Sequence, residues 1–339
     1  MAVIGANLVT LADVAKGKDL KIGKVAEVLV QSNPILGHMP YMEMNEKTVH
    51  IEALRSNLPA VYYRKANQPI PATKSRIEER SFSAAHFESK SQIDVMVAAR
   101  GGQDRVAFNR WNQAQGHIQA MGQEHADLLF YGSPSEDARK VAGITDILST
   151  LTSTEPVSKQ IINAGGVGSD NTSVYFVHWG PDTAFGVYPA GTQAGLKRTD
   201  NGKVQIIGTT ETSVTGTFWG WEEQFEIDHG FVAKDYRALA RVCNIDISNL
   251  IAGGASAADL LKLMTRAHYR IPAHIRAMKG GYVYCNSTIT SFLHEQALDK
   301  VGGGGGLTYG NYQGEQVLMF LGRPVIECDA ILNTESAVS

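Results

Sequence analysis

The sequence predicts an α+β fold in which one long helix stands among strands and loops. Two observations lead to this prediction. Residues 105–131 carry apolar side chains at helical spacing, whereas the segments on either side carry short apolar runs bounded by Gly, Pro, Asn and Asp. The chain has 339 residues, enough for two domains, and it shows no internal repeat.

Charge and cysteine content argue against several classes of protein. The formal net charge is −3, and no tail rich in Lys or Arg suggests nucleic-acid binding. The apolar runs are too short to span a bilayer, and we expect no signal peptide. Cys243, Cys285 and Cys328 lie far apart and are odd in number, which fits reduced thiols and not a disulfide framework or a zinc cluster.

Residues 1–48 are expected to form an arm punctuated by Gly and Pro. One short amphipathic helix is expected there, with Val25, Val28 and Leu29 on one face. The segment has too few apolar residues to be stable alone. It is therefore either a frayed terminus or an arm that becomes ordered on a neighbouring subunit.

Residues 49–93 are expected to form a long two-stranded excursion. Residues 59–65 and 76–88 are strand-like, and the Pro-rich residues 67–74 make the turn. A lone hairpin is marginal in water, so this one needs a surface to lie against, and a neighbouring subunit is one candidate. The predicted inter-subunit contacts are its charged residues Arg64, Lys65, Lys74, Arg76, Glu78, Glu79 and Arg80.

The helix of residues 105–131 has one apolar stripe and outer faces rich in amides. Asp104 is expected to cap its start and Gly132 its end. Gly116 and Gly122 each weaken it by about 1 kcal/mol relative to Ala, so close packing or gentle bending is expected there. The stripe consists of Ala107, Trp111, Ala114, Ile118, Met121, His125 and Leu128. On this stripe, a hydrogen-bonded core histidine is favoured over a metal ligand.

The second half of the chain is expected to be mixed. Two hairpins or strand pairs are expected, the first from residues 173–180 with 184–191, the second from residues 215–227 with 230–247. Helices are expected at residues 256–271, capped by Ser256, and after a strand at 281–285, capped by Asn286 or Ser287. Residues 301–310 are expected to be a flexible loop, and residues 315–332 two short strands.

Motifs for chemistry are incomplete. The glycine-rich loops lack the ending of a phosphate-binding loop, and the zinc-protease pattern that begins at His294 has Leu298 where a second His is needed. On a strand, Asp228 and Glu226 would share one face and His229 would point away, and an exposed strand end is the favoured interpretation. We therefore predict no catalytic residue, cofactor or metal. A hydrolase that uses Asp228 and His229 stays as an alternative.

The order of several segments resembles the major capsid proteins of tailed bacteriophages with the Hong Kong 97-type fold, and most closely those of epsilon15-like short-tailed phages. The segments that carry the resemblance are residues 1–19, 57–75, 112–132, 164–196 and 235–250, the last with Arg237 and Arg241 before Asn-Ile-Asp. The glycine run in the region around residues 298–312 could not be matched to any functional segment of this family. Each motif alone is of modest specificity, and the order and spacing of the motifs make the resemblance strong.

The resemblance implies a domain organisation. It comprises an N-terminal arm (1–48), an extended E-loop (49–93), a P domain with the spine helix (94–150), a mixture of A domain and P-domain strands (151–250), an A domain (251–320) and C-terminal strands that return to the core (321–339).

The resemblance also implies a function: self-assembly into pentamers and hexamers of an icosahedral shell that encloses double-stranded DNA, in a virion assembled in the bacterial cytoplasm. The implied partners are further copies of the chain, a separate scaffolding protein and a portal protein, and a decoration protein is allowed; no membrane is implied. Covalent crosslinking through Lys65 or Lys74 is not expected. An encapsulin-like compartment shell is the alternative with the same fold.

Overall fold

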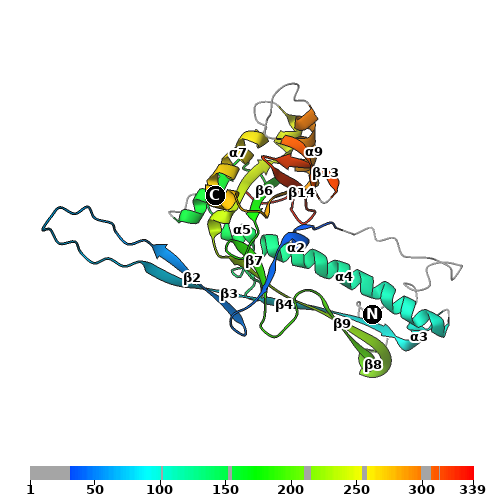
Figure 1. Ribbon diagram of the computed structural model, residues 1–339. Coiled ribbons are helices and arrows are strands. Elements are labelled where there is room, and N and C mark those ends of the chain that lie inside the picture. Colours follow the sequence, from blue (N-terminus) through cyan, green and yellow to red (C-terminus); the bar gives the residue numbers. More distant parts are fainter. Residues whose placement is uncertain are drawn as a thin grey trace. The chain divides into compact units, whose positions relative to one another are not determined.

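The structure is a computed structural model, and it describes residues 31–100, 102–151, 155–209, 215–253, 258–298, 307–312 and 314–339. The chain forms two compact units (Figure 1). Of the described residues, the smaller unit contains 31–33, 86–127 and 193–228, and the larger unit contains 34–85, 128–192 and 229–339. The expected helix around Val25 and Leu29 lies outside the described residues.

The helices and strands have the following bounds. The helices are α2 (Ile35–His38), α3 (Val95–Ala98), α4 (Val106–Tyr131), α5 (Ile144–Ile147), α6 (Ile247–Ala252), α7 (Leu260–Arg270), α8 (Ala273–Arg276) and α9 (Ser287–Leu298), with short 3-10 turns at Gln103–Arg105, Pro156–Gln160 and Tyr236–Ala238. The strands are β1 (Tyr41–Glu43), β2 (Val49–Asn57), β3 (Arg76–Ser83), β4 (Ala85–Asp94), β5 (Ile161–Asn163), β6 (Asn171–His178), β7 (Ala184–Tyr188), β8 (Lys197–Thr209), β9 (Thr215–Ala233), β10 (Leu239–Asp246), β11 (Gly281–Cys285), β12 (Leu307–Tyr312), β13 (Glu315–Phe320) and β14 (Arg323–Glu327).

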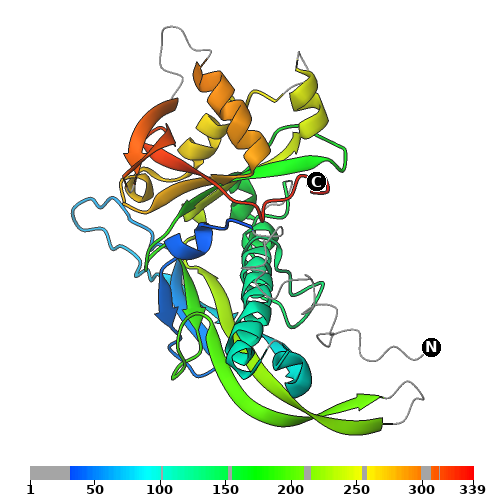
Figure 2. The same cartoon turned by 90° about the vertical axis from the view of Figure 1, so that its right-hand side faces the viewer.

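The larger unit is built on a seven-stranded sheet with the order β12-β13-β14-β11-β6-β10-β5. Strand β6 lies inside the sheet, and every one of its residues is buried. Helices α7 and α9 cover one face of this sheet (Figure 2). The sheet therefore has a protected centre and two edges of different sequence, β12 and β5.

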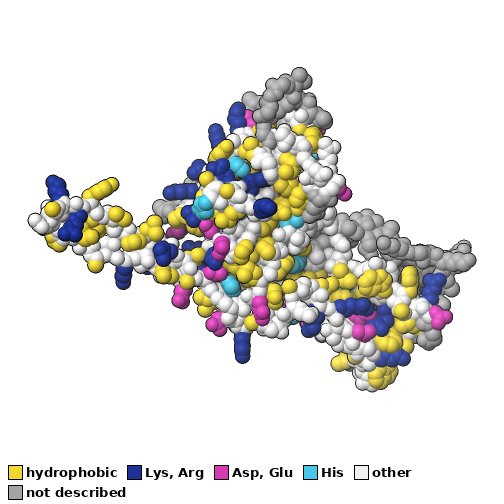
Figure 3. Space-filling view, viewed as in Figure 1, with side chains coloured by type: hydrophobic (Ala, Val, Ile, Leu, Met, Phe, Trp, Pro, Cys, Tyr) yellow, Lys and Arg dark blue, Asp and Glu magenta, His cyan; other side chains and the backbone are white. Residues whose placement is uncertain are grey.

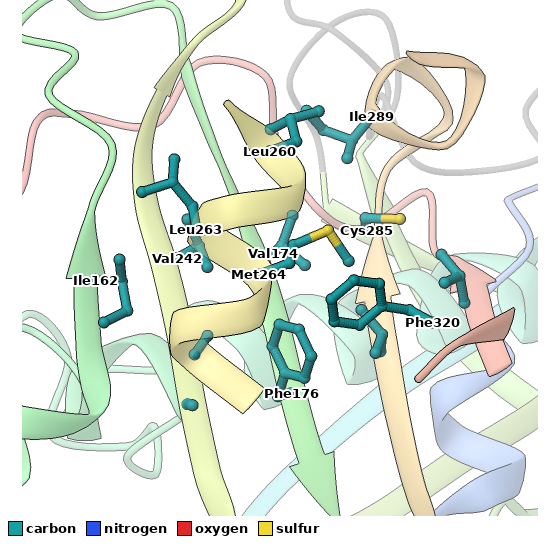
Figure 4. Close-up of a cluster of buried hydrophobic side chains, with 14 of the residues drawn as sticks. Ile162, Val174, Phe176, Val242, Leu260, Leu263, Met264, Cys285, Ile289 and Phe320 are labelled. Carbon is teal, nitrogen blue, oxygen red and sulfur yellow. The ribbon is translucent and has the colours of Figure 1, made fainter. Parts of the chain in front are cut away.

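Apolar side chains from strands and helices form the core between this sheet and its helices. Val174 and Phe176 are two residues apart on β6, so they point to the same face, where they meet Met264 of α7 (Figure 4). Phe320 of β13 lies against Phe176, with ring centroids 6.1 Å apart. All four side chains are fully buried, and burying a side chain of this size contributes about 1.5–3 kcal/mol.

Helices α7 and α9 begin at polar caps, as their sequences favour. The Asp259 side chain accepts a hydrogen bond from the Lys262 backbone N–H (3.2 Å), so the cap of α7 is Asp259. The expected cap Ser256 lies outside the described residues. The Asn286 side chain accepts from the Ile289 N–H (3.0 Å), so of the two expected caps, Asn286 and Ser287, it is Asn286 that caps α9.

Helix α4 in the smaller unit confirms most of the expected apolar stripe. Ala114 and Met121 are buried against Phe225 and Ile227 of β9, and Ile118 packs against the same cluster. The prediction is wrong at the first turns, because Ala107 and Trp111 are exposed. Instead of packing in a core, the Trp111 ring lies 5.7 Å from the guanidinium of Arg198, at cation–π distance.

The glycines of α4 differ from expectation. Within the described residues, a Cβ on Gly116 or Gly122 would meet nothing within 4 Å, so close packing does not explain them. Gly132 follows the helix without a positive φ, and a Cβ there would lie 2.4 Å from the Val141 carbonyl oxygen. Its role is therefore close backbone approach and not a left-handed cap. Asp104 lies in the 3-10 turn that precedes the helix.

The expected hairpin of residues 173–180 and 184–191 is wrong. The two strands, β6 and β7, belong to different sheets: β6 pairs with β10 and β11, and β7 pairs with β1 and β9. The turn between them holds one isolated bridge, Trp179 to Ala184. A short polar turn allows a hairpin, but it does not require the two strands to pair with each other.

The pairing expected for residues 215–247 is also wrong. Residues 215–233 form one continuous strand, β9, which pairs with β8, whereas β10 pairs with β5 and β6. The loop expected at residues 301–310 is partly a strand, because Leu307–Tyr312 pair with β13. The two strands around Gly322 are confirmed as β13 and β14.

Two buried histidines predict acid sensitivity. Burial lowers the pKa of His125 to about 4, and burial together with the positive charge of Arg323 lowers the pKa of His178 to about 3. Below the unfolded pKa of about 6.5, the unfolded chain binds protons that the folded chain excludes, so stability falls as pH falls from 6.5 toward 4. We expect each group to cost about 2 kcal/mol at pH 5.

Thermal unfolding of the unassembled subunit at pH 7.5 and pH 5 measures this effect. His125→Gln and His178→Gln variants should each lose part of the pH dependence. A melting temperature that does not change between the two pH values would contradict the prediction.

Candidate assembly surface

Strands β2 and β3 form a two-stranded hairpin of the larger unit, with Val49 opposite Ser83 and Asn57 opposite Arg76. The expected strand at residues 59–65 is wrong, because residues 58–75 have no regular pairing. Three prolines in this stretch cannot donate to a ladder, which ends the pairing at Asn57 and Arg76. We call residues 58–75 the hairpin tip.

The base of the hairpin is well anchored. Phe82 of β3 packs against a buried cluster that contains Phe185 and Val232. His50 of β2 is buried, lies edge-on to the Phe185 ring (5.6 Å) and pairs with Glu52 (Nε2–Oε1 3.1 Å). The hairpin is therefore held by packing at its base.

The structure brings together two of the seven residues predicted as contacts. Arg76 Nε lies 3.3 Å from Glu78 Oε1, an exposed pair that contributes little stability by itself. Glu79 points to the opposite face of β3, and Arg80 lies opposite Glu52 in the ladder. The remaining three, which form no ion pair within the described chain, are Arg64, Lys65 and Lys74 of the tip.

The sequence interpretation missed the apolar character of the hairpin tip. Val61 is 91% exposed and Leu58 is 71% exposed, values that a self-contained domain avoids for side chains of this size. The other exposed large apolar side chains of the tip are Tyr62, Tyr63 and Ile70. Val61, Tyr62 and Tyr63 stand in residues 59–65, whose apolar composition also predicts a strand.

The hairpin tip is ordered internally by a few contacts. The Thr73 hydroxyl donates to the Ala60 carbonyl (3.1 Å), which links its two legs. Asn67, with φ of 63°, makes its turn. From Arg55 to Ile77 the chain has five basic residues and no acidic one. The tip thus combines exposed apolar side chains with positive charge, which suits a partly apolar, acidic partner surface.

The candidate hydrolase residues do not form a dyad. Asp228 is paired with His86 (Oδ1–Nδ1 2.9 Å), whereas His229, the next residue of β9, is fully buried near the Tyr41 ring (6.5 Å). The expected exposed strand end is wrong, because both residues lie inside the 19-residue strand β9. His294 contacts the Tyr309 hydroxyl (3.2 Å).

Other chemical sites are not assembled in the part of the chain that the structure describes. No group of three or more His, Cys, Asp or Glu residues there could hold a metal ion. The three cysteines are free and buried, and burial raises the pKa of Cys243 to about 11 and that of Cys285 and Cys328 to about 12. Such thiols are protonated and unreactive at neutral pH. No described helix is long and apolar enough to cross a membrane.

The chain is similar to several solved structures. The structure of bacteriophage epsilon15 is similar to this chain with a TM-score of 0.76 and 29% identity, over 100% of this chain and 99% of that chain. A bacteriophage JBD30 capsid has a TM-score of 0.47 and 10% identity, over 95% of this chain and 99% of that chain. An encapsulin complex from Synechococcus elongatus has a TM-score of 0.47 and 8% identity, over 71% of this chain and 97% of that chain. No curated protein matches.

The family comparison covers almost the whole chain. The model of major capsid protein GP7 matches residues 17–339, which include the hairpin, helix α4 and the seven-stranded sheet. The tailed-phage capsid resemblance and the α+β fold class are thereby confirmed. This chain belongs to the major capsid protein GP7 family.

Proposed function

We propose that this major capsid protein forms pentamers and hexamers of a closed icosahedral shell around double-stranded DNA, and that its β2–β3 hairpin lies over an adjacent subunit as the E-loop. The observation that carries the proposal is the hairpin tip, which is anchored at its base but exposes Leu58, Val61 and Tyr63. A group of exposed apolar side chains in one segment is typical of a surface that a partner covers.

The energy available from the tip is large enough for assembly. Burying one Leu or Val side chain contributes about 1.5–3 kcal/mol, so covering several at each contact adds stability repeatedly around a shell. A stable contact buries about 1,000 Å² or more in total, which a projecting hairpin can reach by lying along a neighbour. Because residues 58–75 form no ladder, the tip can also adapt to the different angles of five-fold and six-fold positions.

The division into an arm, an E-loop, a P domain and an A domain is part of this proposal. In it, α4 is the spine helix of the P domain, and the seven-stranded sheet with α7 and α9 belongs to the A domain. The partners in this scheme are a separate scaffolding protein, a portal protein and, where the shell needs one, a decoration protein, and assembly takes place in the bacterial cytoplasm. The family membership supports these roles.

Removal of the hairpin tip tests the proposal. We replace residues 58–75 by Asn-Gly, a two-residue turn that joins Asn57 to Arg76 while keeping the ladder. We expect a folded subunit with an unchanged circular dichroism spectrum, but at least about tenfold less shell, because the apolar contact is lost. Sedimentation velocity and negative-stain microscopy of the expressed protein measure the shells.

A matched variant controls for disturbance of the tip. Asn67 has a positive φ, which glycine adopts freely, so Asn67→Gly should assemble as the unchanged chain does. Normal shells from the shortened hairpin would contradict the proposed role of the tip.

A further inference from the structure

Basic side chains gather on the outer side of helices α7 and α8. From residue 260 to residue 294 the chain has five Lys or Arg residues and no Asp or Glu. Arg266 and Arg270 are one helical turn apart and exposed, so they share a side of α7. We call Arg266, Arg270, Arg276 and Lys279 the basic stripe. Figure 3 shows dark blue side chains over the part of the molecule where Figure 1 places α7.

The basic stripe has no counter-charge within the described residues. Lys262, nearby on α7, is paired with Asp259 (2.7 Å), but no acidic side chain forms such a pair with any member of the stripe. The Arg276 guanidinium lies over the Tyr269 ring at 4.5 Å, and its Nε has no hydrogen-bond partner in the described structure. Arg266, Arg270 and Lys279 are exposed, so the stripe has positive charge available for an acidic partner.

A buried arginine behind the stripe adds to its positive charge. Arg323 is only 7% exposed, and its Nη2 donates to the Arg276 carbonyl (2.9 Å). Burial, followed by the like charge of Arg276, lowers the pKa of Arg323 to about 10. The positive charge of Arg276 disfavours the charged form of Arg323, and an acidic group brought to the stripe would offset that repulsion.

The next segment of the same unit has the opposite charge. From residue 295 to residue 335 the chain has six acidic residues and two basic ones. Glu295, Glu315 and Glu327 are exposed and form no ion pair within the described chain, and we call them the acidic edge. Strands β13 and β14 run antiparallel from their shared turn, so Glu315 at the start of β13 and Glu327 at the end of β14 are both at the strand ends away from that turn.

The two charged surfaces occupy different places on one sheet and its helices. Helix α7 packs on β10, β5 and β6, whereas the acidic edge lies on β13, β14 and α9, with α9 packed on β14. Arg276 of the stripe lies beside Arg323 at the start of β14, whereas Glu327 ends that strand, so one molecule presents positive and negative charge at separate places of the same unit. Two different, complementary surfaces on one chain make a head-to-tail contact, and such contacts close into rings.

We propose that the basic stripe of one copy docks against the acidic edge of the next copy in the same ring. This inference rests on the proposed function, because it names the partner surface within a pentamer or hexamer. A second copy is favoured over nucleic acid, since phosphate groups would explain the stripe but not the complementary, equally unpaired acidic edge.

Charge reversal of each surface tests the contact. The stripe-reversed chain carries Arg266→Glu and Arg270→Glu, and the edge-reversed chain carries Glu315→Lys and Glu327→Lys. Each should raise the protein concentration needed for assembly on the order of tenfold, because like charges then face each other. The chain with all four substitutions should assemble again near the original concentration. Sedimentation velocity measures assembly, and circular dichroism with thermal unfolding checks that each subunit is folded.

A mixture of the two reversed chains gives a sharper result. Stripe-reversed and edge-reversed subunits complement each other only when they alternate around a ring. Alternation is possible around six positions but not around five. The equal mixture should therefore form six-membered rings or open sheets without closed shells, whereas the chain with all four substitutions forms closed shells, as negative-stain microscopy can show.

The control keeps the charge change and moves it elsewhere. Lys47→Glu with Lys90→Glu alters net charge as much as stripe reversal does, at two exposed residues outside both surfaces, and should assemble normally. Stripe-reversed protein that assembles like this control would overturn the inference. Normal shells that hold less DNA would also overturn it and assign the stripe to nucleic acid. If the unchanged chain forms no ring or shell even beside its scaffolding protein, the proposed function fails instead.

Discussion

Glu335→Ala is expected to lower the free energy of unfolding of the subunit by about 3–5 kcal/mol, because it leaves a buried guanidinium without its counter-charge. Arg241 is 1% exposed, and its Nη2 donates to Glu335 Oε2 at 2.8 Å. Its other nitrogens donate to the Ser173 hydroxyl (3.0 Å) and to the Leu148 carbonyl (3.0 Å). Nε, Nη1 and Nη2 of this guanidinium each donate to a protein group. Water could replace these acceptors only if the core opened.

The same carboxylate joins several elements of the larger unit. Glu335 also accepts from the hydroxyls of Tyr131 (2.6 Å), Tyr175 (3.1 Å) and Ser173. The Tyr131 hydroxyl in turn accepts from the Leu332 N–H (2.9 Å). The end of α4, strand β6 and the C-terminal segment therefore lose a shared partner when the carboxylate is removed.

Urea denaturation of the unassembled subunit measures the loss. Glu327→Ala removes an exposed carboxylate and should change stability by no more than about 0.5 kcal/mol. Arg241→Met combined with Glu335→Leu should be milder than Glu335→Ala, because no charge is left buried. A Glu335→Ala subunit as stable as Glu327→Ala would show that the pair contributes no stability.

Gly132→Ala is expected to lower stability by about 3 kcal/mol, since the added methyl group would collide with backbone that cannot move aside. A Cβ at this position would lie 2.4 Å from the Val141 oxygen and 2.5 Å from the Leu128 oxygen. The Gly143 N–H also donates to the Gly132 carbonyl (2.7 Å), which holds the two segments together. The variant must break this contact or displace the end of α4.

Gly116→Ala is the matched control on the same helix. A Cβ at Gly116 would meet nothing within 4 Å, so Ala should stabilise the helix by about 1 kcal/mol. The same Gly-to-Ala change is thus expected to have opposite signs at two positions of one segment, and urea denaturation reports both. Equal effects at the two positions would refute the close approach at Gly132.

The candidate surface could be located from the sequence, but its chemistry was only partly predicted. The excursion at residues 49–93 was expected to need a neighbour, and charged residues such as Arg64 and Lys74 do lie on its exposed tip. The exposure of Val61 and Tyr63 could not be predicted because an apolar run next to prolines has the same composition whether it pairs in a ladder or lies exposed. Only the end of the pairing at Asn57 and Arg76 distinguishes the two cases.

The sequence by itself determined the elements whose signals are local: helix α4 from its apolar period, the start of α9 at Asn286 or Ser287, and the turn at Gly322. The tertiary structure alone decided which strands pair, that β6 and β7 belong to different sheets, and that Arg241 meets Glu335, 94 residues away. Helical spacing and capping depend on neighbours within a few residues, so they can be read along the chain. Strand pairing and buried charge pairs depend on distant segments brought together by burial of the core, and no local pattern specifies that choice.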